Sequence, residues 1–210
     1  MKLIKFEDLH ATPWKNGGGV TRELYGYPAA ASFDAFLWRV SIADVAQTGA
    51  FSSFPGVDRV ITLLEGEGMQ LLADNGKQTS LTMPLQPYCF RGEEQITARL
   101  EGGPCKDFNL MLRRGAASGA VEISRADRVL PPGWELLFCV QGRWDVRSEN
   151  PDSGQATLAP GQTLVRESET GALALRALNA DSVLISVTIN LNANHNINLQ
   201  PGYQHAAESS

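Results

Sequence analysis

The first half of the sequence concentrates the polar side chains best suited to hold a small anion. Arg39 and Ser41 lie in the segment Trp38-Arg39-Val40-Ser41-Ile42. If this segment is a strand, alternation places Arg39 and Ser41 on one face and the three apolar residues on the other. One face must then be polar. It either meets solvent or lines the interior of a barrel that holds a ligand.

A second arginine opens an apolar strand in the segment Asp58-Arg59-Val60-Ile61. The Asp58-Arg59 pair is either a structural ion pair or a device that orients an arginine. A guanidinium group suits the second role because its planar fork matches a carboxylate in a bidentate way.

A third polar segment is Asp107-Phe108-Asn109-Leu110-Met111-Leu112-Arg113-Arg114. Alternation groups Asp107, Asn109 and Met111 on one face, and it leaves an opposite face so apolar that it must be core. Asp107 and Asn109 then face either water or a barrel interior.

The segment Trp14-Lys15-Asn16-Gly17-Gly18-Gly19-Val20-Thr21-Arg22-Glu23 carries three successive glycines. Such a run either lets a ligand approach backbone N–H groups or forms a tight turn before a strand. It is not a P-loop, because no Gly-Lys-Ser/Thr follows. Asn16 and Arg22 crowd around the glycines and keep the ligand-binding interpretation open.

Histidine is scarce, which argues against a metal centre. The three histidines, His10, His195 and His205, lie near the two ends of the chain. The sequence predicts no histidine-based metal site and no cofactor, and it gives no support to Ser–His–Asp or Cys–His catalysis. Paired carboxylates, for instance Glu23 with Asp107, stay open as acid–base groups.

Short apolar runs punctuated by Gly, Pro, Asn or Asp predict the elements that position these residues. They indicate an all-β sandwich or barrel, since no long window has a helical period. One short helix is possible near 42–47. The clearest expected strands are 36–40, 60–64, 95–100, 108–112, 135–140 and 182–189.

An internal repeat indicates that the barrel is duplicated. Gly66 and Gly142 lie in similar strand–turn–strand segments 76 positions apart, and the same offset joins three further pairs: Pro55 with Pro131, Pro84 with Pro160, and Gln86 with Gln162. We therefore expect a double-barrel, bicupin-type fold of jelly-roll halves. Residues 1–115 would form a ligand-carrying barrel, 120–190 a structural barrel, and 191–210 a weakly ordered tail.

Composition excludes several classes of function. The net charge of −5 and the scattered Lys and Arg residues argue against nucleic-acid binding. No apolar stretch approaches the length of a membrane span, and the first residues do not resemble a signal peptide. Cys89, Cys105 and Cys139 are expected as free thiols, so a cytoplasmic location is expected.

The segments above resemble the HutD/Ves family. The matching strings are W-K-N-G-G-G-V-T-R-E (14–23), W-R-V-S-I-A-D-V (38–45), F-S-S-F-P-G-V-D-R (51–59), L-L-E-G-E-G (63–68) and D-F-N-L-M-L-R-R (107–114). The resemblance implies a two-barrel cupin fold without the usual metal histidines, and an association with bacterial histidine utilisation. The motif positions carried over as pocket candidates are Asn16, Arg22, Arg39, Ser41, Arg59, Asp107 and Asn109.

Two functions from different classes follow. The first is a metal-free binding protein for an anionic carboxylate, regulatory in histidine utilisation, with urocanate or N-formylglutamate as the ligand. The second is a metal-free isomerase or hydrolase of a small acid, with Asp107 or Glu23 as general base. A purely structural or protein-interaction role is the third alternative. A homodimer is plausible from fold analogy alone.

Overall fold

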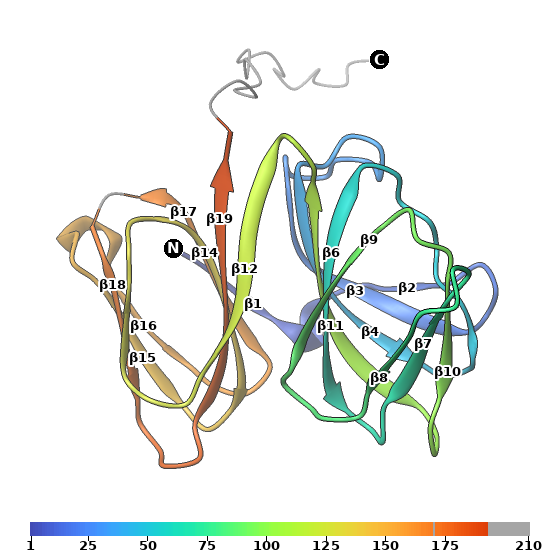
Figure 1. Cartoon of the computed structure of the whole chain (residues 1–210). Coiled ribbons are helices and arrows are strands. Elements are labelled where there is room, and N and C mark those ends of the chain that lie inside the picture. Colours follow the sequence, from blue (N-terminus) through green and yellow to red (C-terminus); the bar gives the residue numbers. More distant parts are fainter. Residues whose placement is uncertain (170, 193–210) are drawn as a thin grey trace, which may run out of the picture.

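A computed structural model describes residues 1–169 and 171–192, and four antiparallel sheets make up nearly all of it (Figure 1). The sheets pair into two barrels. The only helical elements in the described part are two short 3₁₀ turns, η1 (Phe6–Asp8) and η2 (Pro151–Ser153). The sequence-based prediction of an all-β fold is therefore confirmed.

The first barrel consists of a six-stranded and a four-stranded sheet. The strands of the six-stranded sheet are, in spatial order, β2 (Ala11–Pro13), β3 (Gly19–Tyr27), β4 (Trp38–Val45), β11 (Cys105–Arg113), β6 (Val57–Glu65) and β9 (Pro87–Arg91). Those of the four-stranded sheet are β5 (Gly49–Ala50), β10 (Ile96–Leu100), β7 (Met69–Ala73) and β8 (Gln78–Leu81).

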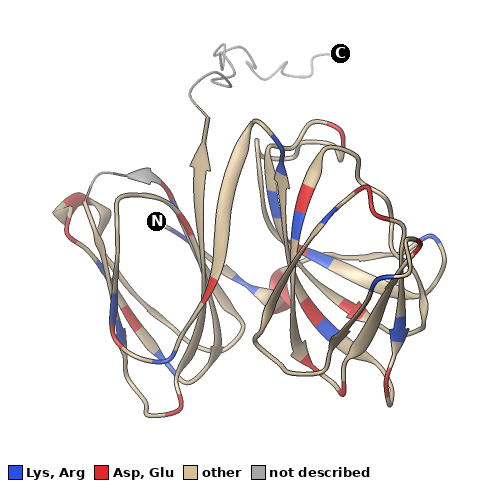
Figure 2. Cartoon of the chain, in the orientation of Figure 1, with Lys and Arg blue, Asp and Glu red and all other residues tan. Residues whose placement is uncertain are grey.

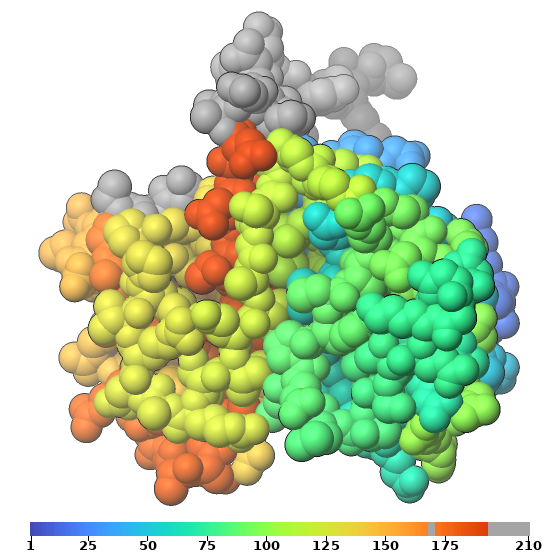
Figure 3. All heavy atoms as spheres, viewed as in Figure 1, coloured from blue at the N-terminus to red at the C-terminus, as the bar shows by residue number. Residues whose placement is uncertain are grey.

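The second barrel consists of a five-stranded and a four-stranded sheet. The strands of the five-stranded sheet are β1 (Lys2–Lys5), β17 (Gln162–Glu169), β14 (Gly133–Gln141), β19 (Val183–Leu191) and β12 (Ala117–Ser124). Those of the four-stranded sheet are β13 (Arg128–Leu130), β18 (Leu173–Ala177), β15 (Trp144–Ser148) and β16 (Gln155–Leu158). Figure 3 shows the two barrels as adjoining lobes.

The strand order confirms the duplication. The order β4-β11-β6-β9 recurs as β12-β19-β14-β17, and the order β5-β10-β7-β8 recurs as β13-β18-β15-β16. Gly66 and Gly142 turn between equivalent strands with φ angles of 99° and 69°. A Cβ atom would lie 2.7 Å from the Pro104 carbonyl oxygen at Gly66 and 2.5 Å from Ser182 Oγ at Gly142. Both turns therefore require glycine.

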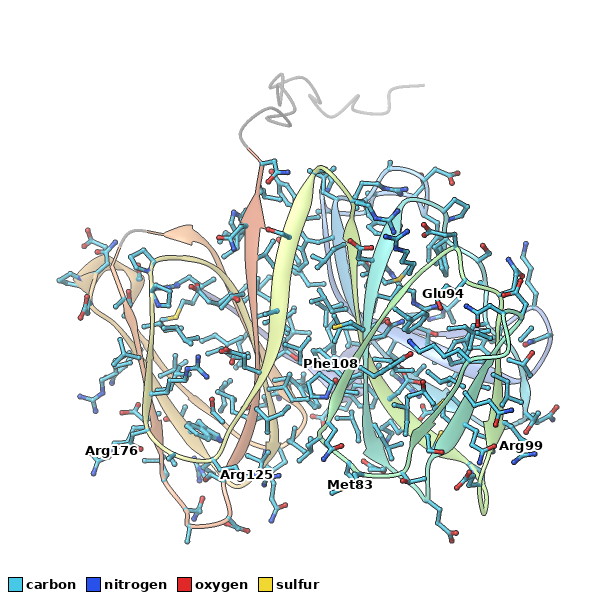
Figure 4. All side chains as sticks on the ribbon, viewed as in Figure 1. Met83, Glu94, Arg99, Phe108, Arg125 and Arg176 are labelled. Carbon is cyan, nitrogen blue, oxygen red and sulfur yellow. The ribbon has the colours of Figure 1, made fainter. Side chains whose placement is uncertain are left out.

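Alternation along the long strands separates two cores. Trp38, Val40 and Ile42 of β4 and Phe108 of β11 point between the barrels, where they pack against the five-stranded sheet of the second barrel. Phe108 lies at this seam in Figure 4. The opposite face of the same strands turns toward the four-stranded sheet and contributes Val45 to the interior of the first barrel.

Three expectations change on this backbone. Residues 42–47 do not form a helix, because β4 continues through Val45 and pairs with both β3 and β11. The first residues leave the first barrel, because β1 pairs with β17 of the second. Leu191 still belongs to β19. Most of the predicted tail lies outside the described residues.

Candidate functional site

The lumen face of the first barrel collects most of the predicted site residues. Met111 of β11 lies opposite Arg39 of β4 and also opposite Arg59 of β6, so the three side chains form one row across adjacent strands. In the next row Asn109 lies opposite Ser41, and Asp107 follows one row further on. Five of the seven predicted residues thus share one face: Arg39, Ser41, Arg59, Asp107 and Asn109.

Arg59 is a buried cation in aromatic surroundings. Only 7% of the residue is exposed, and its guanidinium carbon lies 5.4, 5.6 and 4.8 Å from the ring centroids of Phe51, Phe54 and Phe90. Its Nε is buried, and no described residue accepts a hydrogen bond from it. Burial lowers the Arg59 pKa to about 10, against the opposing effect of Asp107. Arg59 is thus still charged near neutral pH, but it has an unused donor.

Arg39, the second arginine of the row, is better satisfied. Its Nε donates to Glu23 Oε2 at 2.6 Å, and its Nη1 donates to Ser41 Oγ at 3.3 Å. The Phe33 ring centroid lies 5.0 Å from its guanidinium carbon. The Arg39 side chain is 12% exposed and that of Glu23 is 45% exposed. Glu23 therefore neutralises Arg39 from the wetter side of the pair.

Asp107 is the buried acid of the lumen face. The residue is 3% exposed, and burial raises its pKa to about 7, partly offset by the positive charge of Arg59 and reinforced by Asp44. The side-chain oxygen of Asn109 is also buried without a described partner. Asp107 can therefore change its protonation state near neutral pH.

The structure does not bring Asn16 and Arg22 to this face. Arg22 points to the outer side of the sheet, where its Nη1 binds Asp44 Oδ2 at 2.7 Å and its guanidinium lies over Phe6. The exposed Asn16 accepts a hydrogen bond from the Gly18 N–H at 3.0 Å and so closes its own turn.

The glycine run serves the packing of the chain on itself. The carbonyl oxygen of Gly18 accepts from the backbone N–H groups of Ala46 and Gln47, at 2.8 and 3.2 Å. A Cβ atom at Gly19 would lie 3.3 Å from the Trp14 ring. These contacts favour the tight-turn interpretation of the segment.

The second barrel carries a buried ion pair at the equivalent place, which the sequence reasoning missed. Arg59 lies opposite Phe90, and 76 residues later Glu135 lies opposite Arg166. Arg166 Nε donates to Glu135 Oε2 at 2.6 Å, and these side chains are 1% and 2% exposed. Its two other nitrogens bind the carbonyl oxygens of Gly171 and Pro131 at 2.9 and 3.0 Å. Extending the repeat offset to polar positions would have found this pair.

The described residues do not fit a bound metal ion. Within 1–169 and 171–192 no group of three or more His, Cys, Asp or Glu side chains is arranged to hold one. His195 and His205 fall outside the described part. Across those described ranges, no helix has the length and apolar character needed to cross a membrane. In Figure 2 acidic and basic positions are interspersed along the strands of the first barrel.

Two clefts of about 210 Å³ each lie away from the lumen face. Both include Phe6, Pro160 and Gly161, and one also includes Ile42 and Phe138 at the seam between the barrels. Neither includes any of the seven predicted residues. We place the candidate site in the lumen because the buried, incompletely bonded charges lie there.

The sequence comparisons identify the family. The HutD family model matches residues 6–185. An uncharacterised 21.2 kDa protein in the hutC 3′ region of Pseudomonas putida is 42% identical over 111 residues, which cover 53% of this chain and 57% of that protein, so this match spans little more than half of the relative. Protein Ves of Escherichia fergusonii is 34% identical over 185 residues, covering 84% of this chain and 94% of that protein.

Solved structures agree with the fold. HutD from Pseudomonas fluorescens SBW25, in a formate condition, has a TM-score of 0.77 at 29% identity, covering 91% of this chain and 98% of that one. An oxalate decarboxylase from Lactobacillus farciminis has a TM-score of 0.61 at 11% identity, covering 89% and 85%. This second likeness shows a shared cupin-type fold alone. The chain belongs to the HutD family, whose name links it to the histidine-utilisation locus.

Proposed function

We propose that the chain is a binding protein for small carboxylate anions, which it holds in the lumen of the first barrel without a metal. The observation that carries the proposal is Arg59, a buried cation whose Nε has no acceptor among the described residues. A buried donor without a partner costs about 1–3 kcal/mol, and more when it is charged. A carboxylate would supply both the missing acceptor and an opposite charge.

The neighbours of Arg59 suit the same task. Arg39 lies in the same row, and Ser41 and Asn109 in the next row offer a hydroxyl and an amide to a bound oxygen. The phenyl rings around Arg59 exclude water and so strengthen a charge–charge contact. A ligand held here would be small and would meet the guanidinium side-on.

The second barrel supports the proposal by contrast. There the equivalent lumen position already contains a carboxylate, Glu135, bound to a fully satisfied Arg166. The protein thus builds an internal carboxylate partner in one barrel and leaves an arginine with an unused donor in the other. An external carboxylate is the simplest partner for the latter.

The biological setting comes from the relatives. One relative is named for the hutC region, and a solved structure of HutD is given for a formate condition. We propose urocanate or N-formylglutamate as ligands and a regulatory role in histidine utilisation. The regulatory part depends on the family name rather than on any feature of the lumen.

A thermal-shift screen tests the binding function. Formate, urocanate, N-formylglutamate, glutamate and histidine are each added with and without a chelator. A ligand at about one hundred times its Kd stabilises by ~2.7 kcal/mol, which raises Tm by several degrees at roughly 2–4 °C per kcal/mol. A rise that the chelator leaves unchanged supports the proposal. No rise with any acid, or a rise abolished by chelator, contradicts it.

Two arginine variants locate the site. Arg59→Met removes the buried guanidinium and should abolish the response. Arg22→Met is the matched control, because Arg22 projects from the same sheet toward the outer side. Loss of the response in Arg22→Met, with retention in Arg59→Met, would place the anion on the outer face instead.

A second function, a metal-free enzyme acting on a small acid, is favoured by one observation. The Asp107 carboxyl has a pKa raised to about 7, and its charge interacts with that of Arg59. Such a group can abstract a proton while an arginine stabilises developing negative charge. Incubation with each acid and analysis of the products would test it. Turnover lost in Asp107→Asn while binding persists would establish the enzyme.

A further inference from the structure

The charged groups of the lumen face nearly cancel one another. Arg39 is paired with Glu23 at 2.6 Å, and Arg59 interacts electrostatically with Asp107. Arg113, at the end of β11, spends its Nη2 on the carbonyl oxygens of Phe33 and Asp34 at 3.1 and 3.2 Å. With Asp107 ionised, the two arginines of the row are therefore matched by two carboxylates. An added anion would leave excess negative charge in a buried space.

Asp107 is the member of this set whose charge can change. It is 3% exposed, and the charged groups that act on it are Arg59, from β6, and Asp44, from β4. Its neighbour Cys105 on the same face has its pKa raised by burial and by Asp107 itself, so it stays a neutral thiol near pH 7. The facing sheet contributes apolar side chains, Met69, Leu71 and Ala98. Among the described residues no hydrogen bond to the Asp107 carboxylate accounts for its charged form.

We infer that the lumen selects a monoanion and that Asp107 takes up one proton from water when that anion binds. This inference rests on the proposed binding function. The carboxylate of Asp107 becomes a carboxylic acid, and no other bond forms or breaks. The ligand then replaces Asp107 as the counter-charge of Arg59, so the lumen regains neutrality.

The same charge count disfavours a dianion. After one proton has been taken up, a second negative charge on the ligand would still be unmatched in the lumen. The dianion must then keep its second carboxylate in solvent or bind more weakly. This argument ranks urocanate, with one carboxylate, above N-formylglutamate, with two.

Calorimetric titration with formate tests the inference, because formate has one carboxylate and no other group that titrates near neutral pH. The titration is run in two buffers of different ionisation enthalpy. We expect uptake of about one proton per formate near pH 8.5 and almost none near pH 5.5, where Asp107 is already protonated. Above about pH 7 the formate Kd should rise up to tenfold per pH unit.

Asp107→Asn, a nearly isosteric change, should bind formate with no proton uptake and with a Kd that is flat across the same range. Asp58→Asn is the matched control, because Asp58 is half exposed and binds Arg114 on the outer side. It should keep the wild-type proton count and pH slope.

The outcomes separate the two proposals. Formate binding with no proton uptake by the wild type at pH 8.5 overturns the coupling and leaves the binding function standing. No formate binding at any pH, judged by heat and by thermal shift, overturns both. If oxalate binds more tightly than formate at pH 8.5, the preference for a monoanion is wrong.

Discussion

Arg59 and Glu135 occupy equivalent places in the two barrels, 76 residues apart, and each lies opposite a residue that is itself related by the same offset. Phe90 faces Arg59, whereas Arg166 faces Glu135. One barrel therefore encloses a complete ion pair, and the other encloses a cation against an aromatic ring. The same scaffold supports a structural centre in the second half and a chemically incomplete one in the first.

Arg59→Met should leave the protein at least as stable as the wild type. The variant removes a buried charge whose Nε has no described acceptor, and methionine fills a similar apolar volume among the phenyl rings. We expect the free energy of unfolding in urea to be unchanged or to rise by up to ~1–4 kcal/mol. A fall of more than about 2 kcal/mol would assign Arg59 a structural role.

Arg166→Met should behave in the opposite way. It leaves the Glu135 carboxylate buried without its cation and frees two backbone carbonyl oxygens. We expect a loss of ~3–5 kcal/mol in urea unfolding. The double variant Glu135→Leu/Arg166→Met should recover most of that loss, and failure to recover would point to a packing defect instead.

The pH dependence of stability should contain a component from Asp107. Its pKa is raised from 3.8 to about 7 on folding, so the folded state holds a proton that the unfolded state releases. Stability from this group is therefore greatest below about pH 4, falls as pH rises toward 7, and is constant above it. In urea unfolding from pH 4.5 to 8.5, Asp107→Asn should gain stability over the wild type as pH rises. A constant difference would contradict the raised pKa.

Glu23→Gln should tighten anion binding. Glu23 neutralises Arg39, and the neutral amide would leave more positive charge in the arginine row. Since Glu23 is about half exposed and solvent screens its charge, the gain in affinity should be below about tenfold. Isothermal titration with formate at pH 6 would measure it. A weaker affinity would mean that Glu23 positions Arg39 and that this positioning outweighs the charge.

The sequence by itself determined the fold class and the faces of the key strands. Alternation placed Arg39 with Ser41, and Asp107 with Asn109, because successive strand residues must point to opposite sides. The offset of 76 between Gly66 and Gly142 also found the duplication, since a tight turn with positive φ needs glycine in both halves.

Only the tertiary structure decided which polar face is enclosed and which partners its charges have. Arg22 and Arg59 look alike in the sequence, yet one pairs with Asp44 on the outer side and the other is buried among phenyl rings. The reason is that burial and charge pairing depend on strands distant in sequence, here β9 beside β6 and β4 beside β3. Local pattern specifies the side of a strand, and the neighbouring strands specify what that side meets.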